Sequence, residues 1–350
     1  MKFKRLFPLF LTSFLTISLS SCKSSSNSNN SNKDNSSENE TTYSEGNVTT
    51  DEGSEPYIPQ EGDIDAKDIN SSTPIADIVA NNVFTDNYYS SISSSKTGTQ
   101  LRDALYDLVK DHTVKSYNTL EDNMRITDRD WKRCPNVDDE NPYMILIYYT
   151  QNNNSEKQQL WNHYHTSVSK FGVPDDQQSW DKEHIWAKSN GIGSSGAGYS
   201  DLHHLRASDR KNNNTRSSLP FGEVTGSKTY VQDFSGTNSG AKGSSNGTSV
   251  YEPYSIFKGD VARALLYMAV RYKSTLTLTD GTNSSGGKWG FISTLIKWHL
   301  EDPADEFEIK RNSLVQYYQG NRNPFIDKPE YACRIYSSQY SSVKSVCDSH

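Results

Sequence analysis

Apolar residues recur at the spacing of a helix in three segments of the chain. In 100–110 three leucines lie three or four positions apart, and similar spacing occurs in 260–272 and in 291–300. Residues spaced in this way line one face of a helix, so each segment is predicted to be an amphipathic helix. Asp260 is the predicted N-cap of the second helix, and Pro303 is expected to stop the third.

Other segments lack this period. Residues 142–150 (PYMILIYYT) form a short apolar run rich in aromatic and β-branched side chains, and we predict a strand there. Segments 189–200 and 235–248 are rich in Gly, Ser and Asn and are predicted to be loops. No internal repeat is visible, and the part of the chain after residue 96 is predicted to mix helices and strands.

The N-terminus has the pattern of a secretion signal. Three basic residues precede an apolar run over 6–19, which is shorter than the roughly 20 residues that span a bilayer. The run ends in Leu-Ser-Ser-Cys22, which resembles a bacterial lipobox, the motif whose cysteine is lipidated and becomes the first mature residue. We therefore predict that 1–21 is a lipoprotein signal peptide and that Cys22 is lipidated. The alternative is an ordinary secretion signal with a chance cysteine.

Composition changes sharply after this signal. Only 33% of the 350 residues are hydrophobic, and mean hydropathy is −0.80, which is low for a globular chain. Ser, Asn and acidic residues dominate 22–75, which we predict to be a disordered tether before a globular domain at 76–350. The formal net charge is −7, to which the basic signal contributes +3, 22–96 contributes −9 and 97–350 contributes −1. The acidity therefore belongs to the tether and does not argue against a nucleic-acid partner of the domain.

Three cysteines follow Cys22. Cys333 and Cys347 could close a short C-terminal loop in an oxidising compartment, and Cys134 would then lie outside that pair. The alternative is that none of the three is bridged, and spacing alone does not decide between them. No Cys or His spacing typical of a zinc site occurs.

Residues that bear chemistry are concentrated in three neighbouring stretches. These are WDKEHIWAKS at 180–189, DLHHLRASD at 201–209 and DRKNNNTRSS at 209–218. Each residue alone has an ordinary explanation, because a lone His is usually structural and an Asn run is usually a loop. Adjacent side chains on a strand point to opposite faces, so Glu183 and His184 can serve one site only at a strand end or an irregular turn.

The whole constellation resembles the endonuclease I family, which comprises secreted or periplasmic non-specific nucleases of the His-Me finger (ββα-metal) superfamily. The matching residues are EHIWAKS at 183–189, DLHHLRASD at 201–209 and Asn213 with the Arg-Ser pair after it. Further likeness lies in KGDVARALLYMAVRY at 258–272 and QGNRNPFIDKPE at 319–330. The resemblance implies an α+β, predominantly helical single domain around a small ββα-metal core.

The resemblance also implies roles for individual residues. His184 is the expected general base, because neutral imidazole titrates near the working pH. Glu183 and Asn213 are the expected ligands of one divalent ion, and their hard oxygen atoms suit Mg²⁺, Mn²⁺ or Ca²⁺. Asn212 and Asn214 are close enough to Asn213 in sequence to be alternatives to it.

The residue that holds the substrate phosphate is less well defined by the sequence. Better-known family members carry an arginine between the base and the second strand, but 190–200 contains no Arg or Lys. Arg206 and Arg216 are the replacements we consider first, with Lys188 behind them, because guanidinium groups bind phosphate through two hydrogen bonds. A structural salt bridge is the alternative role for Arg206.

We therefore predict a metal-dependent endonuclease that hydrolyses DNA, and RNA as well, to 5′-phosphate products. It is expected to be a monomer outside the cytoplasm, held at the cell membrane by the lipid on Cys22. A member that cuts only RNA remains an alternative, as does a non-catalytic surface lipoprotein that binds nucleic acid. A surface adhesin or solute-binding lipoprotein would leave the 183–217 constellation unexplained.

Overall fold

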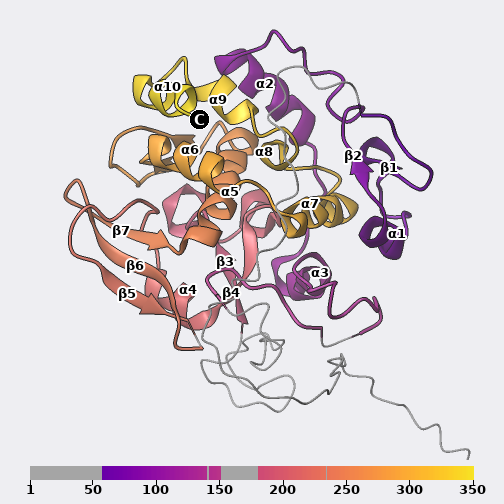
Figure 1. The fold of residues 1–350 in the computed structure, drawn as a ribbon, viewed down its shortest axis with the longest axis horizontal. Helices are drawn as coiled ribbons and strands as arrows, with labels where there is room; N and C mark the ends of the chain where they lie inside the picture. Colours follow the sequence, from indigo (N-terminus) through magenta and orange to yellow (C-terminus); the bar gives the residue numbers. More distant parts are fainter. Residues whose placement is uncertain (1–56, 140–141, 151–179, 234) are drawn as a thin grey trace, which may run out of the picture.

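The computed structural model describes residues 57–139, 142–150, 180–233 and 235–350. Helices predominate in these ranges and the strands are short, so the fold is α+β as the sequence predicted (Figure 1). The predicted signal peptide, Cys22 and most of the predicted tether lie outside the described residues.

The helices and strands follow one another in a fixed order. They are β1 (Ile64–Asp65), α1 (Ile75–Ala80), β2 (Val83–Phe84), α2 (Gly98–Val109), α3 (Leu120–Thr127), β3 (Trp180–His184), β4 (Leu205–Asp209), α4 (Arg210–Arg216), β5 (Thr229–Gln232), β6 (Asn238–Ser245), β7 (Thr248–Pro253), α5 (Lys258–Arg271), β8 (Thr277–Leu278), β9 (Lys288–Trp289), α6 (Ile292–Glu301), α7 (Glu306–Gln319), α8 (Pro324–Asp327), α9 (Tyr331–Tyr336) and α10 (Ser341–Asp348). Short turns of other helix types are η1 (Ala66–Asp68), η2 (Tyr117–Thr119), η3 (Lys188–Ile192), η4 (Ala197–Ser200) and η5 (Ser255–Phe257).

Helix α5 lies at the centre of the main hydrophobic core. Nearly all of its residues are buried, because its apolar side chains cover every side of the helix and not a single stripe. Helices α2, α6 and α8 pack against it and surround it in Figure 1. The helices predicted at 100–110 and 291–300 are confirmed as α2 and α6. The predicted N-cap was wrong, since α5 begins after Phe257 and Asp260 lies inside its first turn.

The site predicted from the sequence falls on a β-β-α unit. Strands β3 and β4 pair in antiparallel fashion, with Glu183 opposite Arg206 and His184 opposite Leu205. Helix α4 begins directly after β4, where Asp209 is its N-cap and accepts a hydrogen bond from the backbone N–H of Asn212. Helix α4 contacts both strands, so residues of β3 and α4 face one another.

Two predictions about strands were wrong. The run at 142–150 forms only isolated bridges, in which Ile147 pairs with β4, and a positive φ of 64° at Tyr148 interrupts it. The glycine-rich segment at 235–248 contains β6, the middle strand of the three-stranded sheet β5-β6-β7. A Cβ atom on Gly240 would lie 2.4 Å from the hydroxyl oxygen of Tyr251, so the glycine permits a close approach that a larger residue would prevent.

Part of the segment predicted to be a tether packs against the body of the protein. Strands β1 and β2 form a parallel pair, and helix α1 lies beside α7. Ile69 and Ile78 are buried with Leu314 of α7 in a small separate cluster. The described residues from 57 onward therefore include folded structure before residue 76.

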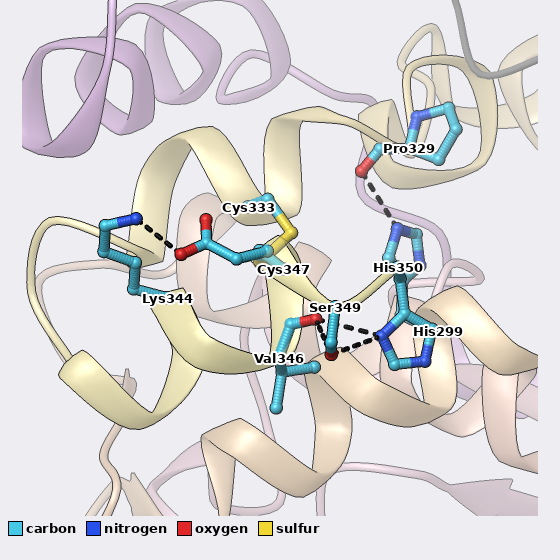
Figure 2. The surroundings of a disulfide bond; sticks show 9 residues. His299, Pro329, Cys333, Lys344, Val346, Cys347, Ser349 and His350 are labelled. Atoms are coloured by element: carbon cyan, nitrogen blue, oxygen red, sulfur yellow. Dashed lines mark hydrogen bonds and ion pairs between the residues drawn. A yellow bond between two sulfur atoms is a disulfide. The ribbon is translucent and has the colours of Figure 1, made fainter.

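The C-terminus is closed by a disulfide between Cys333 of α9 and Cys347 of α10 (Figure 2). This is the pairing that the sequence offered as one alternative. In the described parts of the chain we find no helix with the length and apolar character needed to cross a membrane.

Candidate active site on the β3–β4–α4 unit

The side chains of β3 alternate between two environments. Lys182 and His184 lie on the side of η2 and α3, where the Lys182 ammonium donates to Glu121 at 3.1 Å. Asp181 and Glu183 lie on the side of α4. The expected divergence of Glu183 and His184 is therefore found, and the site has two halves separated by the strand.

The His184 side chain is held by a backbone carbonyl group and by two aromatic rings. Its Nε2 lies 3.0 Å from the carbonyl oxygen of Tyr199, and its ring stacks on the rings of Tyr199 and Tyr117 at centroid distances of 5.1 and 5.6 Å. A carbonyl only accepts, so Nε2 carries the proton and Nδ1 is the basic nitrogen of the neutral ring. Burial lowers the pKa of His184 to about 3, which keeps the free imidazole neutral at neutral pH.

Glu183 is buried on the opposite side of β3. Its Oε1 accepts from the Arg216 guanidinium at 3.0 Å and from the Tyr148 hydroxyl at 3.3 Å. Burial nevertheless raises the pKa of Glu183 to about 7 against the effect of Arg216. The carboxylate is thus only partly compensated by the protein around it.

Helix α4 presents Asn213 to the same face of β3. The Asn213 amide nitrogen lies 3.4 Å from Oδ2 of Asp181, a residue that the sequence analysis did not single out. Asn212 is fully buried and bonds Asp209 and the Tyr251 hydroxyl, while Asn214 is exposed. Of the three asparagines, Asn213 is therefore the one whose side chain faces the acidic residues of β3.

Two of the three basic side chains considered for phosphate are held in buried ion pairs. Arg206 donates to Asp260 at 2.7 Å and to Asp128 at 3.3 Å. These contacts agree with the structural salt bridge that was the alternative role for Arg206. Arg216 is 1% exposed and bonds Glu183. Lys188, in contrast, is exposed at the start of η3, with its Nζ 5.9 Å from the centre of the Tyr199 ring.

The two adjacent histidines of the second stretch are both buried. His204 lies beside His184, with 5.4 Å between ring centroids, and its Nε2 contacts the carbonyl of Gly198 at 2.7 Å. His203 bonds the carbonyl of Asn321 at 3.0 Å on the opposite side. His204 therefore supports the turn that carries Tyr199, and His203 anchors β4 to the C-terminal segment.

Tyr117 and Tyr199 are contacts of His184 that the sequence did not reveal. Tyr199 lies in a loop whose glycines and serines gave no chemical signal, and Tyr117 is distant in the chain. Asp181 did have a signal, because it precedes Glu183 by two positions and a strand places such residues on one face.

The oxygen atoms on this face of β3 fit a divalent cation. Asp181 and Glu183 supply carboxylates, and the facing helix supplies the Asn213 side-chain amide, whose nitrogen lies toward Asp181 and whose oxygen would face it if the amide turned. Burial raises the pKa of both carboxyl groups, so a bound cation would stabilise their ionised forms. Among the described residues no three His, Cys, Asp or Glu side chains gather closely enough to hold a metal ion.

Known proteins share this sequence over most of its globular part. The chain is 35% identical over 272 residues to an extracellular ribonuclease of Bacillus amyloliquefaciens, which covers 75% of the chain and 80% of that protein. An extracellular ribonuclease of Bacillus subtilis (strain 168) is 35% identical over 260 residues, covering 72% and 79%. An extracellular deoxyribonuclease of Aeromonas hydrophila is 33% identical over 79 residues, 23% of this chain and 30% of that protein.

The family match includes the β3–β4–α4 unit and most of the helices around it. The sequence model of Endonuclease I matches residues 97–330, well over half of the chain. The protein is a nuclease and belongs to the endonuclease I family.

Proposed function

We propose that the chain is a metal-dependent endonuclease that hydrolyses phosphodiester bonds of RNA and DNA, with the β3–β4–α4 unit acting as a His-Me finger. The observation that carries the proposal is that a fixed, neutral imidazole lies on one side of β3 while carboxylates and a side-chain amide lie on the other side. His184 is fixed by the Tyr199 carbonyl, and Asn213 faces the acidic side of β3. General-base catalysis needs this kind of fixed, unprotonated nitrogen.

His184 is proposed to take the proton of the attacking water on Nδ1. Its low pKa disfavours the imidazolium in the free protein, and a substrate phosphate beside the ring would offset that cost. Lys188, which is exposed near the Tyr199 ring that stacks on His184, is the residue we propose to hold a phosphate oxygen. Arg206 and Arg216 are proposed to have structural roles, because their guanidinium groups are committed to carboxylates.

The divalent ion is part of the proposal. Glu183 and Asn213 would hold one Mg²⁺, or Mn²⁺ or Ca²⁺ in its place, with hard oxygen atoms. When bound, such an ion supplies Lewis-acid stabilisation of charge on the leaving 3′-oxygen. Departure of the 3′-oxygen leaves a 3′-hydroxyl on one fragment and keeps the phosphate on the 5′-oxygen of the other, so the products are expected to carry 5′-phosphates.

Specificity for RNA alone is the second candidate. It is favoured by the two relatives that match most of the chain, both of which are named extracellular ribonucleases. Separating RNA from DNA requires contacts to the 2′-hydroxyl group, and a direct comparison of substrates decides between the candidates.

The place of action is proposed to be outside the cytoplasm. The relatives are named as extracellular or periplasmic nucleases, and the N-terminal pattern through Cys22 predicts secretion with a lipid anchor. Replacing Cys22 with Ala should move the protein from the membrane fraction to the medium. An unchanged membrane fraction would argue against lipidation at this residue. The monomeric state also remains a prediction, which the molar mass in solution would test.

The test uses the chain from Cys22 onward, purified without the lipid. Plasmid DNA, single-stranded DNA and RNA are each incubated with Mg²⁺, with EDTA, and with EDTA followed by excess Mg²⁺. We expect cleavage that EDTA stops and Mg²⁺ restores, with ends that accept label only after phosphatase treatment. His184→Ala should abolish turnover while the chain still folds, as judged by circular dichroism. Cleavage unaffected by EDTA, or by this substitution, would refute the mechanism.

A further inference from the structure

Asp181 differs from Glu183 in what surrounds its carboxylate. Glu183 is almost fully buried, and its Oε1 is bonded to a buried guanidinium. Asp181 is half-buried, with Oδ1 accepting the backbone N–H of Lys182 at 2.8 Å and Oδ2 facing Asn213. Within the described ranges Asp181 forms no direct ion pair, and Arg210, Lys182 and Lys188 act on its carboxylate from a longer distance. The Asp181 carboxylate therefore has no guanidinium bonded to it, whereas the Glu183 carboxylate does.

Helix α4 distributes its contacts between these two carboxylates. Asn213 and Arg216 are three residues apart and so lie on one face of the helix. Asn213 meets Asp181, and Arg216 meets Glu183 at 3.0 Å. The amide expected to bind the ion is thus placed against Asp181, whereas Glu183 is engaged by a guanidinium that would compete with a cation.

The Asn213 side chain can serve an ion without moving to a new place. Its nitrogen is 3.4 Å from Asp181, which is a long contact for a hydrogen bond to a carboxylate. An amide that turns about its terminal bond exchanges nitrogen for oxygen, and then both side chains present oxygen atoms to the space between them. Such paired oxygen atoms from two elements are typical of Mg²⁺ and Mn²⁺ sites.

We propose that Asp181 is a further protein ligand of the divalent ion, placed beside Asn213, in addition to Glu183. This inference rests on the proposed metal-dependent nuclease function and concerns the same site. Asp181 supplies the half-buried, solvent-reachable carboxylate, and Glu183 supplies charge from the buried side, where Arg216 fixes its position. The site then has three protein oxygen ligands and retains positions for water and substrate.

The experiment measures Mn²⁺ binding without nucleic acid, so that it does not depend on turnover. Loss of the free-Mn²⁺ signal in electron paramagnetic resonance gives the dissociation constant for the chain and for Asp181→Asn, Asp181→Glu and Glu183→Gln. Asp107→Asn is the matched control, because Asp107 is an exposed carboxylate of α2 paired with Lys110. We expect Asp181→Asn to raise the dissociation constant at least about tenfold. Asp181→Glu should recover part of the affinity, and the control should bind as the unaltered chain does.

The outcomes separate the ligand role from the proposed function. If the unaltered chain binds Mn²⁺ and cuts nucleic acid while Asp181→Asn binds within twofold, Asp181 is not a ligand and the nuclease proposal stands. If the unaltered chain cuts in EDTA and binds no Mn²⁺, both proposals are wrong. If Asp181→Asn does not fold, carboxyl NMR of the unaltered chain is used. Mn²⁺ should broaden the Asp181 resonance as it does that of Glu183, and an unbroadened Asp181 signal overturns the inference.

Discussion

Replacing Arg216 with Ala should destabilise the fold before it affects substrate binding. The guanidinium bonds the Glu183 carboxylate, the carbonyls of His184 and Ile185, and the carbonyl of Leu219, and the side chain is 1% exposed. Removing one partner of a buried ion pair costs about 3–5 kcal/mol, because the other charge is left uncompensated. Small domains have about 5–15 kcal/mol of stability in total, so this loss is large.

Urea unfolding monitored by circular dichroism measures the loss for Arg216→Ala. Arg216→Lys is the informative companion, because it keeps the charge but cannot reach Glu183 and three carbonyls with a planar fork. We expect Arg216→Lys to lie between the unaltered chain and Arg216→Ala in free energy of unfolding. Lys344→Ala, in an exposed pair with Asp348, is the control and should change stability by no more than about 0.5 kcal/mol.

Lys188→Ala should show the opposite behaviour. Lys188 is exposed, so its removal should change the free energy of unfolding by no more than about 0.5 kcal/mol. Because it is proposed to hold a phosphate, KM should rise and the salt dependence of duplex binding should fall by about one released ion. If Arg216→Ala instead leaves stability unchanged and raises KM with a weaker salt dependence, Arg216 holds the phosphate and the structural interpretation is wrong.

Three other measurements test separate parts of the structure. Asn213→Ala should weaken Mn²⁺ binding with little loss of stability. Asn212→Ala should instead lose about 1–3 kcal/mol of stability, because Asn212 is buried and hydrogen-bonded. Equal effects of the two substitutions would contradict the different roles given to these asparagines. Burial raises the pKa of Asp302 to about 6, so ionising this carboxyl group costs stability as pH rises from about 4 to 7. The free energy of unfolding of Asp302→Asn should therefore gain about 2 kcal/mol relative to that of the unaltered chain over this pH range. A difference in unfolding free energy that does not change with pH would show that burial of Asp302 is not responsible. Replacing Cys333 and Cys347 with Ala should cost about 3 kcal/mol, the chain-entropy value for a loop closed over a separation of 14 residues, and an unchanged urea midpoint would contradict it.

The sequence predicted elements well where one period dominates. Helices α2 and α6 follow directly from their apolar spacing, and their ends lie within two residues of the predicted ones. Strand β6 was missed because its glycines resemble a loop, although Gly240 is needed for the approach of the Tyr251 ring. The run at 142–150 has the composition of a strand, but a composition does not reveal that Tyr148 has a positive φ.

The sequence predicted site residues well where the residues that contact one another lie close together in the chain. Glu183, His184 and Asn213 lie within one β-β-α unit, so the motif placed them in one region, while their roles remain predictions. Arg206 was a candidate phosphate ligand because the sequence does not show its ion pairs. Its partners, Asp128 and Asp260, are 78 and 54 residues away in the chain. Spacing within a motif carries no information about carboxylates that approach from other elements.

Strand β3 shows how adjacent Glu and His residues could serve the proposed site together. Because β3 alternates, Glu183 and His184 are on opposite sides of a single backbone, and each can be given a different environment. The His184 side is aromatic and keeps the imidazole neutral, whereas the Glu183 side is lined by Arg216 and Asn213 of α4. A base and a cation site placed on the same face would raise the cost of protonating the base, because the cation would repel the imidazolium. In the proposed mechanism the base and the ion therefore lie on opposite sides of β3, and both could act on a phosphate at the end of the strand.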